Sequence, residues 1–127
     1  MSFDTIATAL ARHPALELAI VFGSVARGQA RSDSDIDIAV QADHPLSADD
    51  KIRLIEDLAM ATGRPVDLID LATVGAPLLG EILRDGKRII GRNHDLAELA
   101  LRNIYLNEDF MPYVQRALHA RNHQWLQ

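Results

Sequence analysis

Cysteine, aromatic residues and long apolar runs are scarce or missing in this sequence of 127 residues. The absence of cysteine excludes disulfide bonds and thiolate zinc sites, so any bound metal must be held by oxygen or imidazole. The N-terminus carries the acidic Asp4 and no uninterrupted apolar stretch, and nowhere does the chain approach the ~18 apolar residues that span a bilayer. We therefore expect a soluble cytoplasmic protein with no membrane partner.

An excess of basic charge is also missing. The formal net charge is −5, which argues against broad binding of nucleic acid, because that requires a basic surface to release counterions. The charge does not argue against binding of a small phosphate ligand, since one loop and a metal ion can hold it. With 48% hydrophobic and 24% charged residues, the composition is that of an ordinary globular protein. The chain has no repeat, low-complexity tract or linker, and we expect a single domain over residues 1–127.

The hydrophobic periodicity predicts alternating helices and short strands. Helices are expected over 3–10, from Ser47 to Gly63, from Pro77 to Gly86, and in a C-terminal segment over about 94–125. Strands are expected over 18–22, 36–40, 66–71 and 88–90. The predicted inward-facing residues are Ile52, Ile55, Leu58 and Ala59 in the second helix, and Leu96, Leu99, Ala100 and Ile104 in the last.

The first two predicted strands differ in pattern. Residues 18–22 form a compact apolar run that ends at a glycine, which predicts a strand buried on both faces. Over 35–40, isoleucine and valine alternate with Asp35, Asp37 and Ala39, which predicts one apolar face and one face carrying carboxylates. The carboxylates would therefore lie on an exposed side of the sheet.

A glycine-serine pair and an Asp-x-Asp pair stand at a fixed spacing. Gly23-Ser24 is followed after ten residues by Asp35-Ile36-Asp37. Residues two apart on a strand point the same way with Cα atoms about 6.6 Å apart, so both carboxylates can reach one cation. Without a cation, the pKa of one of them would rise. Mg²⁺ prefers oxygen ligands and is usually held by one or two carboxylates with substrate phosphates, so it suits this pair.

The glycine has its own physical role. Without a Cβ, Gly23 can adopt the turn at the strand end and lets phosphate oxygens approach backbone N–H groups, while Ser24 adds a hydroxyl donor. A P-loop is excluded, because Gln29-Ala30 replaces the Lys and Ser/Thr that it requires. A G-x-G-x-x-G dinucleotide motif is absent as well.

These residues carry a resemblance to a known family. Gly23 to Gly28, followed by Ser34-Asp35-Ile36-Asp37-Ile38, resembles the G-S-x10-D-x-D signature of polymerase β-like nucleotidyltransferases, and within them the minimal nucleotidyltransferases (MNT). The resemblance covers roughly the first ninety residues. It implies an α+β fold with a small mixed sheet, a catalytic core over about 1–92 and C-terminal helices beyond it.

The family also has a third carboxylate on a later strand, in a Val-Asp-Leu context that Asp67 matches. Asp70 is its rival, but the two side chains point to opposite sides of a strand, so only one can join the cluster. The resemblance favours Asp67, and a turn or cap role is the ordinary one for Asp70 near the strand end.

The resemblance implies a reaction as well. Asp35 and Asp37, helped by Asp67, would bind two Mg²⁺ ions, while Gly23, Ser24 and Arg27 receive the triphosphate of ATP, the usual donor in the MNT group. An acceptor hydroxyl would attack the α-phosphorus and release pyrophosphate. About thirty residues follow the core, so we expect another protein to present the acceptor. MNT proteins are commonly antitoxins that adenylylate a tyrosine of a HEPN ribonuclease toxin, and this is the leading hypothesis.

Two alternatives remain open. The chain could be a binding antitoxin that neutralises the toxin by complex formation alone. It could also be a small-molecule (antibiotic) nucleotidyltransferase that works as an oligomer, with the acceptor pocket between subunits. The sequence leaves the oligomeric state, the base preference and the number of added nucleotides undecided.

The remaining candidates have ordinary explanations. Arg27 is as readily a solvated charge as a phosphate ligand, and Arg31 and Arg64 are weaker candidates. His119 and His123 lie four residues apart, a spacing that can bind a metal ion, but no third ligand accompanies them. The aromatic residues near the C-terminus either pack against the core or form a binding surface; they are Tyr105, Phe110, Tyr113 and Trp125.

Overall fold

The protein is built on a four-stranded mixed sheet with the order β3-β2-β1-β4. The structure is a computed structural model and describes residues 3–31 and 33–106. The strands are β1 (Leu16–Phe22), β2 (Ile36–Ala42), β3 (Val66–Asp70) and β4 (Lys87–Ile90). β1 runs antiparallel to both β2 and β4, whereas β2 and β3 are parallel. The parallel pair requires the crossover that the helix between them provides.

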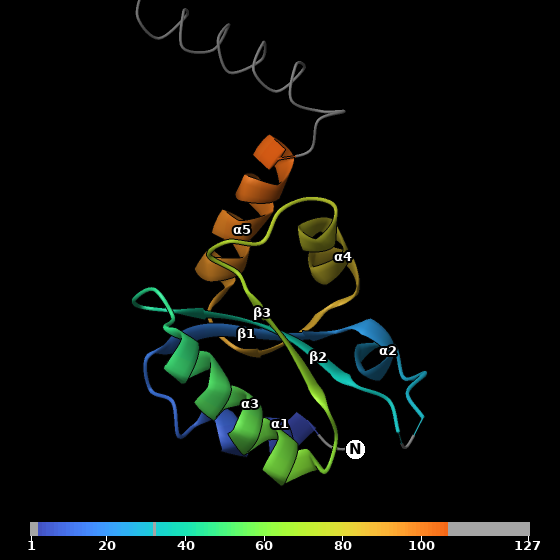
Figure 1. Cartoon of the computed structure of the whole chain (residues 1–127). Helices are drawn as coiled ribbons and strands as arrows, with labels where there is room; N and C mark the ends of the chain where they lie inside the picture. The colour runs from blue at the N-terminus through green and yellow to red at the C-terminus, as the bar shows by residue number, and fades with distance from the viewer. Residues whose placement is uncertain (1–2, 32, 107–127) are drawn as a thin grey trace, which may run out of the picture.

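Helices cover both faces of the sheet (Figure 1). α1 (Phe3–Leu10) and α3 (Ala48–Thr62) pack on one face, which we call the α1/α3 face. α4 (Leu78–Asp85) and α5 (Asn93–Leu106) pack on the other, the α4/α5 face. The short α2 (Gly23–Ala26) follows β1 at one end of the sheet. The predicted α+β fold with a small mixed sheet is therefore confirmed.

The central strand β1 is buried on both faces, as its apolar run predicts. Ala19 and Val21 belong to the core under α1 and α3, and Ile20 and Phe22 belong to the core under α4 and α5. The prediction for β2 was wrong in part. Ala39 is fully buried on the α4/α5 face, so the carboxylates of that face are confined to the start of β2, beside α2.

α3 begins and ends as its sequence predicts. Ser47 and Asp50 form a capping box with both hydrogen bonds 3.0 Å long, and Gly63 closes the helix in the left-handed conformation at φ 69°. The predicted apolar stripe was wrong at Ile52, which is 51% exposed, whereas Leu54 is buried together with Leu58. Leu54 and Leu58 are four residues apart and share one face, while Ile52 projects from another side of the helix.

α4 also matches its prediction, since it begins after Pro77, ends before Gly86 and buries Leu79 and Ile82. α5 departs from its predicted stripe. Leu99 is buried, but Ala100 is exposed and Ile104 is 42% exposed, because the second half of the helix extends past the sheet (Figure 1). Within the described residues no helix has the length and hydropathy to cross a membrane. The predictions for the segment beyond Leu106, including His119, His123, Phe110, Tyr113 and Trp125, lie outside the described residues.

Candidate active site

The turn after β1 brings the two halves of the sequence motif into contact. β1 ends at Phe22, and Gly23 starts α2 with a φ of 69°, a conformation that favours glycine. A Cβ at Gly23 would overlap the carboxylate of Asp37. The backbone conformation therefore favours glycine here, and a Cβ would fit only if the Asp37 carboxylate were displaced. Ser24 follows in the first turn of α2 and is half-buried.

The register of the sheet places two carboxylates side by side. Asp37, on β2, pairs with Asp67 on the parallel neighbour β3 and with Phe22 on β1. Asp67 acts on Asp37 through its negative charge and through a side-chain hydrogen bond, both of which raise the pKa of Asp37. Asp35 stands one residue before β2, is exposed, and acts on Asp37 through its charge. Asp37 therefore interacts more strongly with its cross-strand neighbour Asp67 than with Asp35 of the Asp-x-Asp pair.

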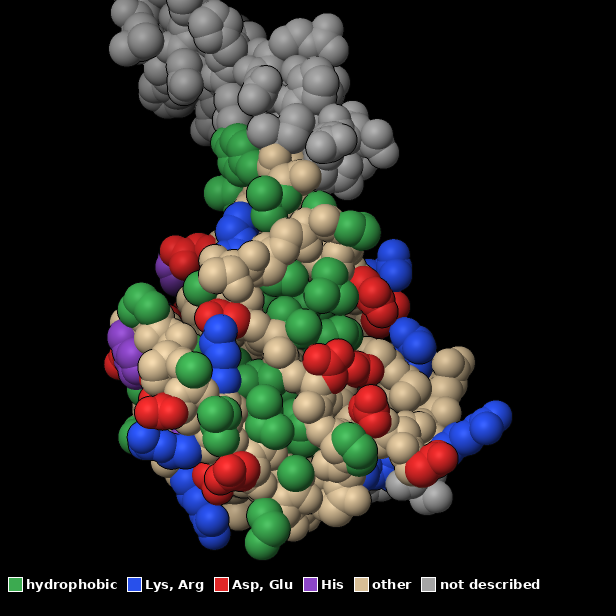
Figure 2. Space-filling view, in the orientation of Figure 1, with side chains coloured by type: hydrophobic (Ala, Val, Ile, Leu, Met, Phe, Trp, Pro, Cys, Tyr) green, Lys and Arg blue, Asp and Glu red, His purple; other side chains and the backbone are tan. Residues whose placement is uncertain are grey.

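Burial and negative neighbours raise the pKa of Asp37. Burial is the largest cause, followed by the charges of Asp67 and Asp35 and the hydrogen bond with Asp67. Glu81, in the first turn of α4, adds a weaker contribution. Figure 2 shows acidic side chains gathered on this face over β2 and α4. The site is therefore a concentration of negative charge that a cation would relieve.

The donor set fits a hard cation that substrate phosphates help to bind. Among the described residues, no three carboxylate or imidazole side chains already lie close enough together to surround an ion. Mg²⁺ needs fewer protein ligands, because water and phosphate oxygens complete its shell. A hydrogen-bonded carboxyl pair with a third acid nearby suits that mode of binding, and it contains no sulfur or imidazole that would favour zinc.

Asp70 lies on the opposite face and has a different role. Its Oδ1 accepts a hydrogen bond from the Ala72 backbone N–H at 2.9 Å, and its Oδ2 is 3.9 Å from Nζ of Lys51 on α3. Asp70 therefore shapes the turn after β3. The geometry agrees with the expectation that Asp67, and not its rival, stands beside Asp37.

Arg27, the candidate phosphate ligand, and Arg64, one of the two weaker candidates, each contact other groups of the protein in this structure. Arg27 lies at the end of α2, where Nη1 is 3.9 Å from Asp85 on α4 and Nε donates to Gln29 at 3.4 Å. An ion pair of that length between accessible side chains is weak, so Arg27 can exchange partners. Arg64 donates to backbone carbonyls of the loop that precedes Asp35.

Glu81 is the residue that the sequence did not reveal. Its neighbours Leu79 and Ile82 define the buried side of α4, and the helical pattern alone leaves Glu81 as one more polar residue. Its position near Asp37 follows from how α4 packs on the sheet, and no spacing motif links α4 to the acids of β2.

The chain belongs to the polymerase β nucleotidyltransferase family, whose model, described as "Polymerase beta, Nucleotidyltransferase", matches residues 4–95. It is 35% identical over 91 residues to the protein adenylyltransferase MntA of Shewanella oneidensis, a match that spans 72% of this chain and 66% of that protein.

Two solved structures are similar over nearly the whole chain. One is a toxin-antitoxin complex with AMP-PNP, with a TM-score of 0.76, 28% identity and full coverage of both chains. The other is a tri-AMPylated Shewanella oneidensis HEPN toxin in complex with its MNT antitoxin, with a TM-score of 0.68, 27% identity and coverage of 98% and 96%.

Proposed function

We propose that this chain is a Mg²⁺-dependent adenylyltransferase that moves AMP from ATP to a tyrosine hydroxyl of a HEPN ribonuclease toxin and so acts as its antitoxin in the cytoplasm. The observation that carries the proposal is the contact between Gly23 and the Asp37 carboxylate, with Asp67 and Asp35 beside it. It joins a phosphate-accepting turn to a cation-binding cluster. The similarity to an adenylyltransferase and to structures with AMP-PNP and an AMPylated toxin supports the choice of donor and partner.

The residues divide the work by their position. Asp35, Asp37 and Asp67 would hold the metal, which when bound neutralises the triphosphate and lowers the pKa of the acceptor hydroxyl. The backbone N–H groups that begin α2 at Gly23 and the Ser24 hydroxyl donate to phosphate oxygens. Arg27 leaves its loose contact with Asp85 and pairs with the same phosphates.

The transfer itself is a substitution at phosphorus. The acceptor oxygen bonds to the α-phosphorus, the bond from that phosphorus to pyrophosphate breaks, and the hydroxyl proton passes to Asp67 or to water. Alignment and charge neutralisation supply most of the acceleration. AMP on a tyrosine near the active site of a ribonuclease adds negative charge and bulk, which is sufficient to block RNA.

The test is transfer of label from α-labelled ATP to the partner toxin with Mg²⁺. The double variant Asp35→Ala/Asp37→Ala should transfer nothing, whereas the control Asp49→Ala/Glu56→Ala, which removes two exposed acids of α3, should match the wild type. Label transfer that persists in the first variant contradicts the proposal, and EDTA should abolish transfer in all variants.

A binding antitoxin is the second candidate, and one observation favours it. α5 exposes a group of large apolar side chains, namely Leu101, Ile104, Tyr105 and Leu106, which is unusual for a surface that faces only water. The discriminating experiment is growth rescue at equal expression. Neutralisation of the toxin by Asp35→Ala/Asp37→Ala would favour complex formation over catalysis.

A further inference from the structure

Arg64 ties the connection before β3 to the loop before β2. It stands between the C-cap Gly63 and Pro65, and its Nη1 donates to the carbonyl of Arg31 at 2.6 Å and to that of Ser34 at 3.4 Å. The Arg31 carbonyl also accepts the Ser34 backbone N–H at 3.1 Å. One guanidinium therefore holds both ends of a tight turn.

The contacts of this connection lie on both sides of Asp35. On one side, the carbonyl of Ser34 accepts from Arg64. On the other, the backbone N–H of Ile36 donates to the carbonyl of Pro65 at 2.9 Å. The two peptide groups that flank Asp35 are thus fixed by adjacent residues of a single segment, 64–65, and the direction of the Asp35 side chain depends on that segment.

Asp35 needs such support more than the other two acids do. Asp37 and Asp67 lie inside the β2–β3 pairing, where the sheet fixes their backbone. Asp35 precedes the first paired residue, Ile36, and its side chain is exposed. A displacement of the 31–34 turn would move Asp35 while leaving Asp37 in place.

We propose that Arg64 is a positioning residue, which sets the geometry of the metal site by holding the loop that carries Asp35. The inference rests on the proposed function, since it assigns Asp35 to the metal. Groups that orient metal ligands typically contribute 10–100-fold in metal affinity or activity. Arg64 acts through the backbone, which a guanidinium can do because its planar donors suit two carbonyl oxygens at once.

A direct contact with phosphate is the competing role for Arg64. Its side chain lines a small cavity of about 190 Å³ together with Val25, Gly28 and Ala30. However, Arg64 is directed onto peptide carbonyls of the 31–34 turn, and Val25 packs against the core of the α1/α3 face. The carboxylates Asp37 and Asp67 lie on the other face, so a triphosphate beside them is not expected to reach Arg64.

The experiment measures metal binding separately from catalysis. Mn²⁺ binding to the full chain with AMP-PNP is followed by electron paramagnetic resonance, and AMP transfer to the partner is titrated with Mg²⁺. The variants are Arg64→Ala, Arg64→Lys and the control Arg53→Ala, which removes an exposed arginine from α3. Thermal melting reports whether each variant folds.

We expect Arg64→Ala to weaken Mn²⁺ binding and to raise the half-saturating Mg²⁺ concentration about tenfold, with an unchanged KM for ATP at saturating Mg²⁺. Arg64→Lys should recover part of the loss. The inference is overturned if Arg64→Ala equals Arg53→Ala, or if it raises only the KM for ATP. If Arg64→Ala does not fold, Arg64→Gln takes its place, and metal binding equal to the wild type in that variant overturns the inference. A wild-type chain that binds Mn²⁺ but transfers no AMP would refute the proposed function and leave the positioning role intact.

Discussion

The two faces of the sheet differ in how completely they are covered by apolar side chains. On the α1/α3 face, strand residues such as Ile38 and Val40 are fully buried beneath two helices, and a complete capping box starts α3. On the α4/α5 face, apolar residues give way to Asp37 and Asp67 at the end of the sheet beside α2. The apolar core of the α1/α3 face stabilises the fold. The clustered carboxylates of the α4/α5 face reduce stability, as functional sites commonly do.

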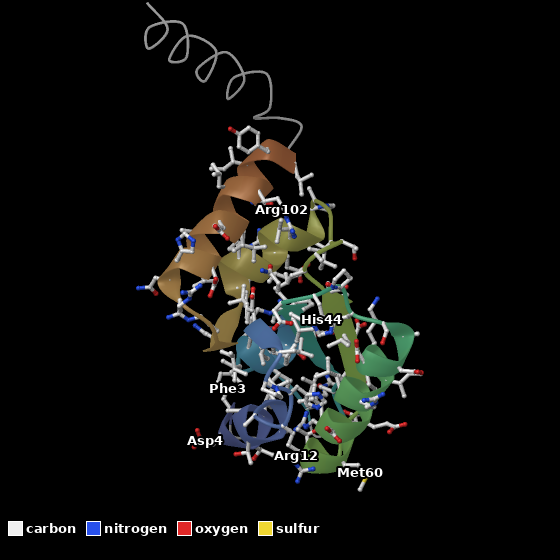
Figure 3. All side chains as sticks on the ribbon, turned by 90° about the vertical axis from the view of Figure 1, so that its left-hand side faces the viewer. Phe3, Asp4, Arg12, His44, Met60 and Arg102 are labelled. Carbon is white, nitrogen blue, oxygen red and sulfur yellow. The ribbon has the colours of Figure 1, made fainter. Side chains whose placement is uncertain are left out.

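Polar groups on the α4/α5 face are less completely satisfied. Figure 3 shows Arg102 of α5 directed toward α4, and its guanidinium donates to the carbonyl of Leu71. Among the described residues, its Nε is a buried nitrogen without a hydrogen-bond partner. On the opposite face the exception is an exposed apolar side chain instead of an unpaired polar atom. Met60, at the end of α3, is 87% exposed and projects into solvent (Figure 3).

The largest expected effect on stability comes from a substitution in the core of the α1/α3 face. Leu58→Ala removes a fully buried side chain from the core under α3 and should lower the free energy of unfolding by about 3 kcal/mol, measured by urea denaturation. Because Leu58 is remote from the acids, the folded fraction should retain the wild-type kcat. A proportional loss of kcat in the folded fraction would mean that the two faces are coupled.

The next largest expected effect is a loss of activity from a substitution in the active site that leaves the core unchanged. Gly23→Ala places a Cβ against the Asp37 carboxylate, so we expect AMP transfer to fall about 100-fold, the scale on which small misplacements act. Gly63→Ala is the matched control, since it has the same φ of 69° with nothing within 4 Å of the added Cβ. Both variants carry a backbone cost of about 1–2 kcal/mol, and an equal activity in the two would contradict the role of the Gly23 contact.

A smaller effect sharpens the picture of the α1/α3 face. Ser47→Ala removes the cap of α3 and should cost about 1 kcal/mol at pH 7. The Ser47 backbone N–H and, to a smaller extent, its hydroxyl lower the pKa of Asp50 below its usual 3.8, so the stabilisation from the Asp50 carboxylate is present above pH 3.8 and is lost as the pH falls through the lower folded-state pKa. Ser47→Ala keeps the backbone N–H, and the bond from the Asp50 N–H to the Ser47 hydroxyl involves no titrating group, so both proteins should lose stability in acid while most of the difference between them remains, as followed by thermal melting between pH 7 and pH 2.

The sequence predicts local features well, but it predicts contacts between residues distant in the sequence poorly. The Ser47 and Gly63 caps, the doubly buried β1 and the turn role of Asp70 each depend on neighbours within a few residues, and the structure has them as expected. The Asp37–Asp67 hydrogen bond depends on which strands pair and in which register, and periodicity carries no such information. The interaction of Glu81 with Asp37 and the hydrogen bonds from Arg64 to the 31–34 turn cannot be predicted from the sequence for the same reason. Each joins segments that are distant in the sequence and that only the fold brings together.

The smallest expected effect tests whether the acids of the α4/α5 face reduce stability. The pKa of Asp37 is raised, so its ionised form is disfavoured in the folded state; this penalty is absent below the usual value of 3.8 and fully present above the folded-state pKa. Asp37→Asn removes the charge and should raise the melting temperature at pH 7 slightly while abolishing AMP transfer. The gain should vanish below pH 3.8, where the wild-type carboxyl is also neutral, and it should shrink when Mg²⁺ and AMP-PNP bind the wild type. A melting temperature at pH 7 below that of the wild type would mean that Asp37 stabilises the fold, and the contrast between the two faces would then not hold.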